Sequence, residues 1–545
     1  MSLLRARRAT GLGLLLLSAL ATPSSHAYSP GPLPEQPLPD FGVYAPPIVP
    51  SDFEPCTVLL THHLFANSYG SPAIIQYEPP TDCGNPGTWA SIVMNFTATS
   101  NGTQYDRLSH SSLIACEVWR TSTPEPTALG IIWTAQKDVS RYSPLFAEPG
   151  SMIVDLGNIL DASSGLTGEY DGKCSIWLSA SFYPSSLQYP SAKAADVILP
   201  LSTLSNNSAN LFAVPPFGAT NVTIPPNSAQ AFVEIYASGN GDEEFWYGNV
   251  PDEYFDQLPT WSAPDGYASP HGPFREVQLL IDGTLAGVVF PYPVIYTGEF
   301  LPSLWRPMVS YGAFDSPTYY VDITPFLGSL CSSPSPSHNF TLTGAGMGPG
   351  QPINANWYVS GNVQVVLDKT GKQTNGSVTV REGQGDVTAA VEGQVSGMNV
   401  SVTTVAGRKL YIEGDVFTGS GYTKATWEQN LEFTNSEVYQ TSLGNVSVQT
   451  VTQMSKGTSI STHNGVSMVS DTFTYPLYLQ LQYATYNNGT SYDYIVDLDH
   501  SFIRALSMAV QPLTENIDTR QICQGTQVWA FDRLTSPLGG LTRLT

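Results

Sequence analysis

The sequence predicts an all-β protein made of two β-sandwiches and a further C-terminal β module. The chain has 545 residues with 47 Gly, 43 Pro and only 12% charged side chains, a composition that disfavours long surface helices. Short runs of alternating apolar and polar residues, separated by Gly- and Pro-rich turns, recur along the chain and are typical of strands. We place the sandwiches at residues 53–215 and 216–370 and the module at 371–545.

The N-terminal residues are expected to lie outside the fold. Within residues 1–27, three arginines (Arg5, Arg7 and Arg8) precede the apolar run GLGLLLLSAL, and small residues lead up to Ala27. This order is typical of a secretory signal peptide that is cleaved after Ala27. No later stretch reaches the roughly 18 apolar residues of a membrane span. We therefore expect a secreted, extracellular protein without membrane contact after signal removal.

Residues 28–52 are rich in Pro and are interpreted as a linker. In the first sandwich, SMIVDLGNI (151–159) and SIWLSASFY (175–183) alternate as half-buried strands do. In the second, QAFVEIYASG (230–239) is a strand, and EVQLLIDGTLAGVVF (276–290) is a hairpin that turns at Asp-Gly. Beyond about residue 375, strand follows strand with Gly turns.

Charge and cysteine usage narrow the classes of function. The net charge of −23 argues against a nucleic-acid surface, which needs a basic patch, and suits work at low pH. An even number of cysteines in a secreted chain favours disulfides over a catalytic thiol. Proximity in the chain suggests two pairs, Cys56–Cys83 and Cys116–Cys174, whereas Cys331 and Cys523 are left without a suggested pairing.

Nine Asn-x-Ser/Thr sequons predict a glycoprotein with exposed sequon loops. They lie at Asn95, Asn101, Asn206, Asn221, Asn339, Asn375, Asn399, Asn445 and Asn488.

One stretch, GNGDEEFWYGNVPDEY at residues 239–254, concentrates acids and aromatic rings. Three acids at 242–244 directly precede three rings at 245–247. Rings stack on the apolar face of a sugar and carboxylates accept hydrogen bonds from its hydroxyls, so the stretch is a candidate sugar site. A plain turn and a loop of Ca²⁺ ligands remain alternatives.

Two further stretches carry candidate catalytic groups. QYDRLSH contains Asp106 and Arg107, and EVWRTSTPEPTALGIIWTAQKDVSRY contains Glu125. Two carboxylates in different environments can divide acid and base roles, and an arginine can hold an oxyanion. Alternatively, Asp106 and Arg107 form a surface ion pair of little consequence. No HxH or HExxH pattern occurs, so we do not expect a zinc site, and we interpret His271 as a loop residue in preference to a metal ligand.

Several long segments, taken together, resemble the acid, plant-type (A-type) peptide:N-glycanases. They are RTSTPEPTALGIIWTAQKDVSRY, GNGDEEFWYGNVPDEY, GPFREVQLLIDGTLAGVVFPYPVIYTG and LWRPM…TYYVDITPFLG. The resemblance runs from about residue 54 to the C-terminus. It implies a secreted or vacuolar glycoamidase that acts at acidic pH on N-glycosylated peptides or unfolded glycoproteins, without a cofactor.

A fainter likeness to the bacterial F-type peptide:N-glycanase implies two packed jelly-roll-like sandwiches with the active site between them. Its Trp-Asp-Arg triplet corresponds to Tyr105, Asp106 and Arg107 here. Its second acidic position falls at or near His271, and its third falls on Ser179. A second carboxylate must therefore come from elsewhere.

The acid-aromatic stretch is the best supplier of that carboxylate, with Glu244 first, then Glu243, and Glu125 from the other stretch as a further candidate. We expect Asp106 to activate water, Arg107 to steady the substrate carbonyl and Glu244 to act as the second acid. Because consecutive strand residues point to opposite faces, Asp106 and Arg107 can share a site only where the backbone bends.

The remaining candidates are substrate-binding residues: Tyr105, Glu125, Glu243, Trp246, Tyr247 and His271. The two rings at 246 and 247 are expected to stack on the chitobiose core. A glycosidase that cuts between sugars and a glycan-binding lectin without turnover remain rival interpretations, and the oligomeric state stays open.

Overall fold

The computed structural model describes residues 37–44, 46–51, 53–160, 170–258, 268–348, 350–442, 446–486, 491–510, 513–530 and 541–544. Within them the protein is built mostly of strands, which confirms the all-β prediction. The longest helix in this part of the chain, α4, has only six residues. No helix of the described residues is long and apolar enough to cross a membrane. The jelly-roll connectivity stays a prediction.

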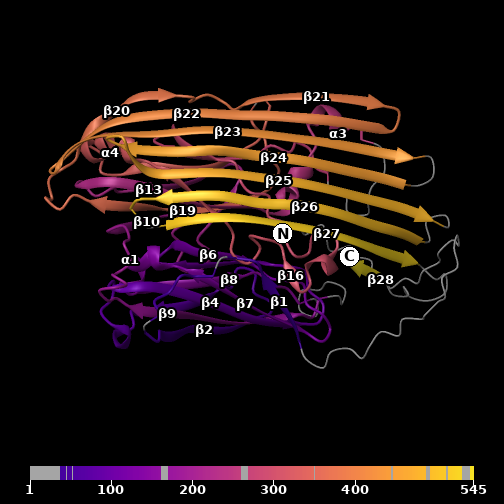
Figure 1. Ribbon diagram of the computed structural model, residues 1–545, viewed down its shortest axis with the longest axis horizontal. Helices are drawn as coiled ribbons and strands as arrows, with labels where there is room; N and C mark the ends of the chain where they lie inside the picture. Colours follow the sequence, from indigo (N-terminus) through magenta and orange to yellow (C-terminus); the bar gives the residue numbers. More distant parts are fainter. Residues whose placement is uncertain are drawn as a thin grey trace.

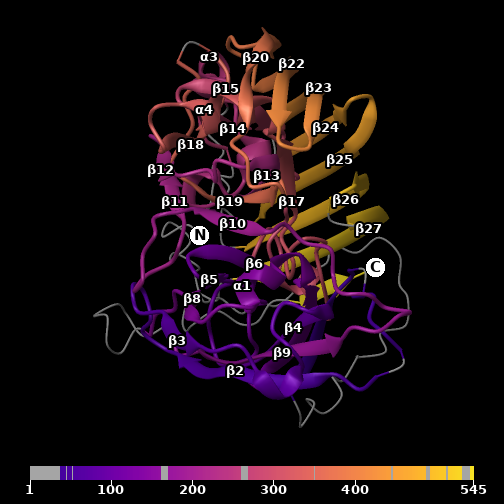
Figure 2. The ribbon, with the colours of Figure 1, turned by 90° about the vertical axis from the view of Figure 1, so that its left-hand side faces the viewer.

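The first sandwich pairs a six-stranded sheet, in the order β16-β1-β7-β4-β9-β2, with a four-stranded sheet, β3-β8-β5-β6 (Figures 1 and 2). On β7 every second side chain is buried, as expected for a strand with one face on the core. The strands are β1 (Leu38–Gly42), β2 (Cys56–Phe65), β3 (Ala73–Tyr77), β4 (Trp89–Asn101), β5 (Leu108–Leu113), β6 (Cys116–Ser122), β7 (Ile131–Asp138), β8 (Gly150–Leu156), β9 (Lys173–Pro184) and β16 (Met308–Val309).

Part of the expected linker is a strand of this sheet. β1 pairs in parallel with β7 on one side and with β16 on the other. Because β16 belongs to the chain beyond residue 300, β1 ties the first sandwich to the polypeptide that builds the second.

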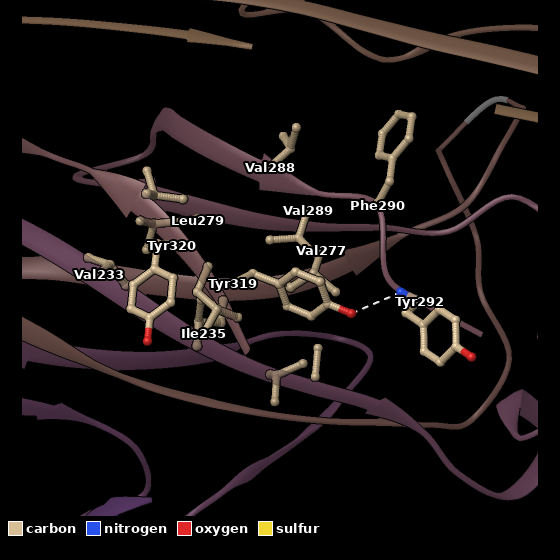
Figure 3. Close-up of a cluster of buried hydrophobic side chains, with 14 of the residues drawn as sticks. Val233, Ile235, Val277, Leu279, Val288, Val289, Phe290, Tyr292, Tyr319 and Tyr320 are labelled. Carbon is tan, nitrogen blue, oxygen red and sulfur yellow. Dashed lines mark hydrogen bonds between the residues drawn. The ribbon is translucent and has the colours of Figure 1, made fainter. Parts of the chain in front are cut away.

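The second sandwich consists of a five-stranded sheet, β10-β19-β13-β17 with β11 on β19, and a four-stranded sheet, β12-β18-β14-β15. Side chains of both sheets meet in its core, among them Val233 and Ile235 from β13 and Val277 and Leu279 from β14 (Figure 3). The strands are β10 (Val197–Leu201), β11 (Phe212–Val214), β12 (Gly218–Val222), β13 (Ser228–Gly239), β14 (Glu276–Ile281), β15 (Thr284–Val289), β17 (Thr318–Asp322), β18 (His338–Ala345) and β19 (Trp357–Leu367).

The predicted hairpin at residues 276–290 is confirmed. β14 and β15 pair in antiparallel fashion around Asp282 and Gly283, whose φ angles are 48° and 76°. A two-residue turn with both φ angles positive matches the right-handed twist of the strands, and Asp-Gly suits it because glycine accepts such angles without strain.

A nine-stranded antiparallel sheet runs along one side of the second sandwich, within the described residues (Figure 2). Six of its strands have 18 to 22 residues. A buried ion pair, Arg408–Glu276 (2.5 Å), joins it to β14. The strands are β20 (Asn375–Glu382), β21 (Thr388–Ser396), β22 (Asn399–Thr418), β23 (Gly421–Ser442), β24 (Val446–His463), β25 (Val466–Tyr486), β26 (Ser491–Met508), β27 (Leu513–Ala530) and β28 (Leu541–Leu544).

Short helices occupy the connections between strands. Two of them, η4 and η5, follow β13 directly and contain part of the acid-aromatic stretch. The helices are η2 (Thr81–Cys83), η3 (Ser140–Tyr142), α1 (Ser143–Phe146), η4 (Gly241–Glu243), η5 (Trp246–Gly248), α3 (Asp252–Phe255), η6 (Pro302–Trp305), η7 (Thr324–Phe326) and α4 (Leu327–Ser332).

The cysteine pairing is half as predicted. Cys56 and Cys83 form a disulfide. The suggested pair Cys116–Cys174 is wrong, because both are free thiols, and Cys331 and Cys523, also candidates for disulfides, are free as well. Cys116 opens β6 of the four-stranded sheet, and Cys174 lies on β9 of the six-stranded sheet, so the two sulfurs belong to opposite layers of the core. Burial raises the pKa of the Cys174 thiol to about 12.

The described sequon asparagines are mostly on the surface. The exposed ones are Asn101, Asn206, Asn221, Asn339, Asn375 and Asn399, whereas Asn95 on β4 is half-buried. Asn445 and Asn488 lie outside the described residues. Glycosylation at these positions stays a prediction.

Candidate functional site

A small cavity lies where the two sandwiches meet, and the structure brings the two main candidate carboxylates together in it. Asp106 reaches it from the first sandwich and Glu244 from the second. We call it the interface cavity; its lining residues are Asp106, Leu108, Ser122, Gly239, Asn240, Glu244 and Tyr296.

Asp106 is directed into the cavity by the irregular segment between β4 and β5. The backbone of Arg107 exchanges two hydrogen bonds with Thr123, one to its Oγ1 (2.9 Å) and one from its N–H (2.8 Å). On the other side, a Cβ atom at Gly298 would lie 2.2 Å from Asp106 Oδ1 and 3.0 Å from Glu125 Oε1. Only glycine therefore permits both carboxyl groups to approach the backbone at this point.

Arg107 points away from the interface cavity, as alternation along an extended chain predicts. Its guanidinium donates to the Tyr69 hydroxyl (2.5 Å) and to Gln104 Oε1 (2.5 Å). It also stacks over the ring of Tyr105, 3.4 Å from the ring centre. The arginine thus holds aromatic side chains in place and is not among the residues that line the cavity.

Two tyrosines contact this arginine, and two more lie next to them; the four form what we call the tyrosine cluster: Tyr69, Tyr105, Tyr170 and Tyr358. The hydroxyl oxygens of Tyr69 and Tyr105 are 3.4 Å apart, and Tyr170 meets Tyr105 edge to face. Tyr69 is 56% exposed. Tyr358 lies near Asn240, a lining residue of the interface cavity, which acts to lower the pKa of this tyrosine. An aromatic surface open to solvent therefore adjoins the buried carboxylates.

The two adjacent glutamates of the acid-aromatic stretch have opposite environments. Glu243 is fully buried and forms a two-point ion pair with Arg275, whose Nη2 lies 2.6 Å from Oε1. It also accepts hydrogen bonds from Trp357 Nε1 (2.7 Å) and from the Asn354 amide (2.8 Å). Glu244, one residue later, lines the cavity. The first glutamate therefore anchors the loop, and the second faces the site.

The rings of the same stretch are packed inside the protein. Trp246 is 3% exposed and lies 5.8 Å from the ring of Trp357, and Tyr247 is 1% exposed. The Tyr247 hydroxyl donates to Glu299 (2.5 Å), and its carbonyl accepts a hydrogen bond from Asn435 of the nine-stranded sheet (2.8 Å). In this structure these rings stiffen the loop that presents Glu244.

His271 lies in a loop with φ of 75°, and its Nδ1 is 3.1 Å from Asp252 Oδ1. It does not line the interface cavity. Among the described residues, no group of three His, Cys, Asp or Glu side chains is placed to hold a metal ion.

A buried charge network supports the floor of the site. Arg120 donates to both carboxylate oxygens of Glu117 (2.8 Å each) and, through Nη1, to the Ser238 hydroxyl (2.8 Å). Burial alone would raise the pKa of Glu117, but Arg120 and His110 outweigh burial and hold that pKa well below its usual range. Ser238 in turn lies near Tyr296, which lines the interface cavity, and acts to lower the pKa of that tyrosine.

Tyr296, the tyrosine cluster and this network were missed by the sequence analysis, apart from Tyr105. Tyr69, Tyr170 and Tyr358 lie in stretches that are far apart in the chain and carry no local motif. Tyr296 does fall inside one of the segments that resemble the plant-type enzymes, so that resemblance was the only available signal.

A larger cavity, of about 570 Å³, lies elsewhere, against the first strands and the ends of β26 and β27. Three of its basic lining residues have acidic partners: Lys137 is 2.7 Å from Asp315, Arg141 is 2.9 Å from Glu234, and Arg504 is 2.6 Å from Asp471. Neither carboxylate of the interface cavity lines it. We therefore place the functional site in the smaller cavity, where carboxylates and a hydroxyl converge in a confined space and can serve acid-base chemistry.

Comparison with known proteins agrees with the resemblance seen in the sequence. A family model described as peptide N-acetyl-beta-D-glucosaminyl asparaginase amidase A matches residues 46–384, and one described as PNGase_A C-terminal domain matches residues 401–477. A Prunus dulcis protein named peptide-N4-(N-acetyl-beta-glucosaminyl)asparagine amidase A is 32% identical over 505 residues, which are 88% of this chain and 83% of that protein. The first match includes every lining residue of the interface cavity.

Proposed function

Because this chain belongs to the peptide N-acetyl-beta-D-glucosaminyl asparaginase amidase A family, we propose that it hydrolyses the amide bond between an asparagine side chain and the innermost GlcNAc of N-glycopeptides. The structural observation that carries the proposal is the convergence of Asp106 and Glu244 in one cavity between the two sandwiches. The products are a peptide with aspartate in place of asparagine and a glycosylamine, which then loses ammonia.

Asp106 acts as the general base. Its carboxylate takes a proton from a water molecule as the water oxygen attacks the amide carbon, and the carbonyl π electrons move onto the carbonyl oxygen. When the tetrahedral intermediate collapses, the C–N bond breaks and the nitrogen leaves with a returned proton. Glu244, across the cavity, is the second acid and binds or protonates the sugar-bearing side of the amide.

The tyrosine cluster supplies the sugar-binding surface. Tyr69, the most exposed ring, and Tyr105 offer faces on which a pyranose can stack. Arg107 fixes both rings and so acts on sugar binding instead of on the amide carbonyl. Glu125, beside Asp106 at Gly298, adds a carboxyl group within reach of sugar hydroxyls.

The sequence and the structure also support a proposal for the compartment and the pH at which the enzyme acts. The signal-like segment at residues 1–27 and the disulfide between Cys56 and Cys83 support a secreted or vacuolar enzyme. The low pKa of Glu117 supports work at acidic pH, because the ion pair below the site stays charged there. Short or unfolded glycopeptides are the expected substrates, since a narrow cavity admits only an accessible linkage.

Digestion of an N-glycopeptide, read by mass spectrometry, tests the proposal. The wild-type protein is expected to release the intact glycan and leave Asp in the peptide. Asp106→Asn should reduce this turnover by at least about a thousandfold, because loss of a general base and of its charge removes transition-state stabilisation. Asp252→Asn, at a 62% exposed acid outside the cavity, is the matched control and should keep full activity.

The product separates the rival functions. A glycosidase would leave a GlcNAc on the asparagine, and a lectin would bind the glycopeptide without forming product over time. Either outcome would overturn the amidase proposal, as would full turnover by a folded Asp106→Asn variant.

A further inference from the structure

Tyr296 brings the only phenolic hydroxyl among the lining residues of the interface cavity. Its side chain is 6% exposed, and the nearby Ser238 hydroxyl on β13 acts to lower the pKa of Tyr296 as a hydrogen-bond donor. Glu244, also in the cavity, is close enough for its charge to influence the pKa of Tyr296. The tyrosine is therefore held between a buried polar network and the carboxylates of the site.

The direction of the hydrogen bonds in this network can be worked out from its donors. An arginine guanidinium can only donate. Arg120 therefore donates to Ser238 Oγ, where the distance is 2.8 Å. Ser238 therefore keeps its own proton, and we assign that proton to the Tyr296 oxygen because Ser238 acts to lower the pKa of Tyr296, as a donor to its oxygen does. Tyr296 then keeps its own proton for another acceptor, and the residue lines the interface cavity.

We propose that Tyr296 is a catalytic residue whose hydroxyl donates a hydrogen bond to the carbonyl oxygen of the scissile amide while negative charge builds on that oxygen. This inference rests on the proposed amidase function and adds an oxyanion-stabilising group to it. A preorganised donor in a confined cavity is effective because it needs little reorganisation during the reaction.

The role requires no net proton transfer from the tyrosine. Asp106 accepts the proton of the attacking water, and the tyrosine O–H stays intact throughout. The environment supports this: burial raises the pKa of Tyr296 above its ordinary value, Arg120 opposes that rise, and the charges of Glu299 and Glu244 add to it. The phenol thus remains a neutral donor at every pH at which the carboxylates titrate.

Ser238 and Arg120 are positioning residues in this scheme. Ser238 fixes the direction of the Tyr296 hydroxyl, and Arg120 holds Ser238 while itself held by Glu117. Together they form a series of hydrogen-bonding groups that leads from the buried ion pair to the interface cavity. Removal of either should therefore change turnover more than substrate affinity.

The test is steady-state kinetics of Tyr296→Phe on an N-glycopeptide. We expect kcat to fall about 100- to 1000-fold, as for loss of one oxyanion donor, with KM within about twofold of wild type. The control is Tyr320→Phe, which also removes a buried hydroxyl, one that lies 3.0 Å from Glu234 and outside the cavity. It should keep the wild-type kcat.

Ser238→Ala is a second test of the proposal, and it replaces the first test if the Tyr296→Phe protein does not fold. It should lower kcat about 3- to 10-fold, the cost of one neutral hydrogen bond, without raising KM. Wild-type kcat in a folded Tyr296→Phe protein, or an effect confined to KM, would overturn the inference while the amidase function stands. If the wild-type protein itself releases no glycan, the proposed function fails first.

Discussion

Two buried networks of glutamate, arginine and tyrosine lie at the junction of the sandwiches, and they end differently. The first runs from Glu117 through Arg120 and Ser238 to Tyr296 and opens into the interface cavity. The second is centred on Glu234, which binds Arg141 (2.9 Å), Tyr142 (2.7 Å) and Tyr320 (3.0 Å). No residue of this second network lines the interface cavity.

The comparison shows that a buried ion pair with tyrosines does not by itself indicate a functional site. In both networks burial acts to raise the pKa of the glutamate, and the neighbouring arginine, with hydrogen-bond donors, lowers it overall. Both glutamates are therefore ionised and both stabilise the contact between the sandwiches. Only the network that ends in a hydroxyl facing the cavity can also act on a substrate.

The largest combined effect is expected from Glu117→Gln. The change leaves Arg120 buried without a counter-charge, which costs about 3–5 kcal/mol of unfolding free energy. It should also lower kcat about tenfold, because the guanidinium that orients Ser238 loses its two-point anchor. Denaturant unfolding and glycopeptide kinetics on the folded protein measure the two effects. An unchanged kcat would separate this network from catalysis.

Glu234→Gln tests the second network, which does not reach the interface cavity. It should cost a similar free energy of unfolding, about 3–5 kcal/mol, because Arg141 is left buried without a counter-charge, but kcat per folded molecule should not change.

Glu432→Gln is the control at the surface. It removes one half of an ion pair with Lys456 in which both side chains are more than half exposed, and it should cost less than about 1 kcal/mol of unfolding free energy. A large loss of kcat in Glu234→Gln would abolish the distinction between the networks.

Glu437 on β23 is also buried, but its pKa is shifted in the opposite direction. Within the described residues, no arginine is among the groups that influence this pKa. Burial raises its pKa to about 8, and the hydrogen bond from Tyr439 (2.6 Å) only partly opposes this rise. The carboxyl is therefore protonated in the folded protein at acidic and neutral pH. Its effect on stability should depend on pH in the opposite direction from that of Glu117.

The sign of this dependence follows from the folded pKa of about 8 and the ordinary glutamate pKa of 4.5, which applies to the unfolded chain. Between these values the folded protein binds the extra proton, so stability is full below pH 4.5 and is lost as the pH rises through about 8. Glu437→Gln cannot titrate and should raise the unfolding free energy at about pH 8 by roughly 2–4 kcal/mol relative to wild type. Equal effects at pH 5 and pH 8, by thermal unfolding, would contradict the assignment.

The fold was largely predictable from the sequence because its signals are local. Alternating burial produced the strands, and the Asp282-Gly283 turn produced the hairpin. The meeting of Asp106 and Glu244 was predicted from resemblance, since no local pattern joins residues so distant in the chain. The sequence could not show which of two adjacent glutamates faces the site, because that depends on Arg275 and Trp357, which lie far along the chain.

The same limit explains the aromatic residues. A Trp-Tyr pair beside acids has the composition of a sugar site, but these rings are buried because η5 packs beneath the nine-stranded sheet. The exposed rings, including Tyr69, come from segments with no acidic motif. Composition indicated the chemistry of the region, and only the tertiary contacts distinguish a supporting ring from a binding ring.

A small effect on turnover is expected from the nine-stranded sheet, which contacts the segment that follows Glu244 through side chains such as that of Asn435. Asn435 donates to the carbonyl of Tyr247 (2.8 Å) and is 1% exposed. Asn435→Ala should cost about 1 kcal/mol of unfolding free energy and lower kcat about two- to threefold, because Glu244 loses part of its backing. Asn464→Ala is the control. It also removes a hydrogen bond from a side-chain amide to a backbone carbonyl, that of Tyr422 (3.0 Å), but it does so at an exposed turn. If both variants show the same kcat, the sheet supports the fold without influencing the site.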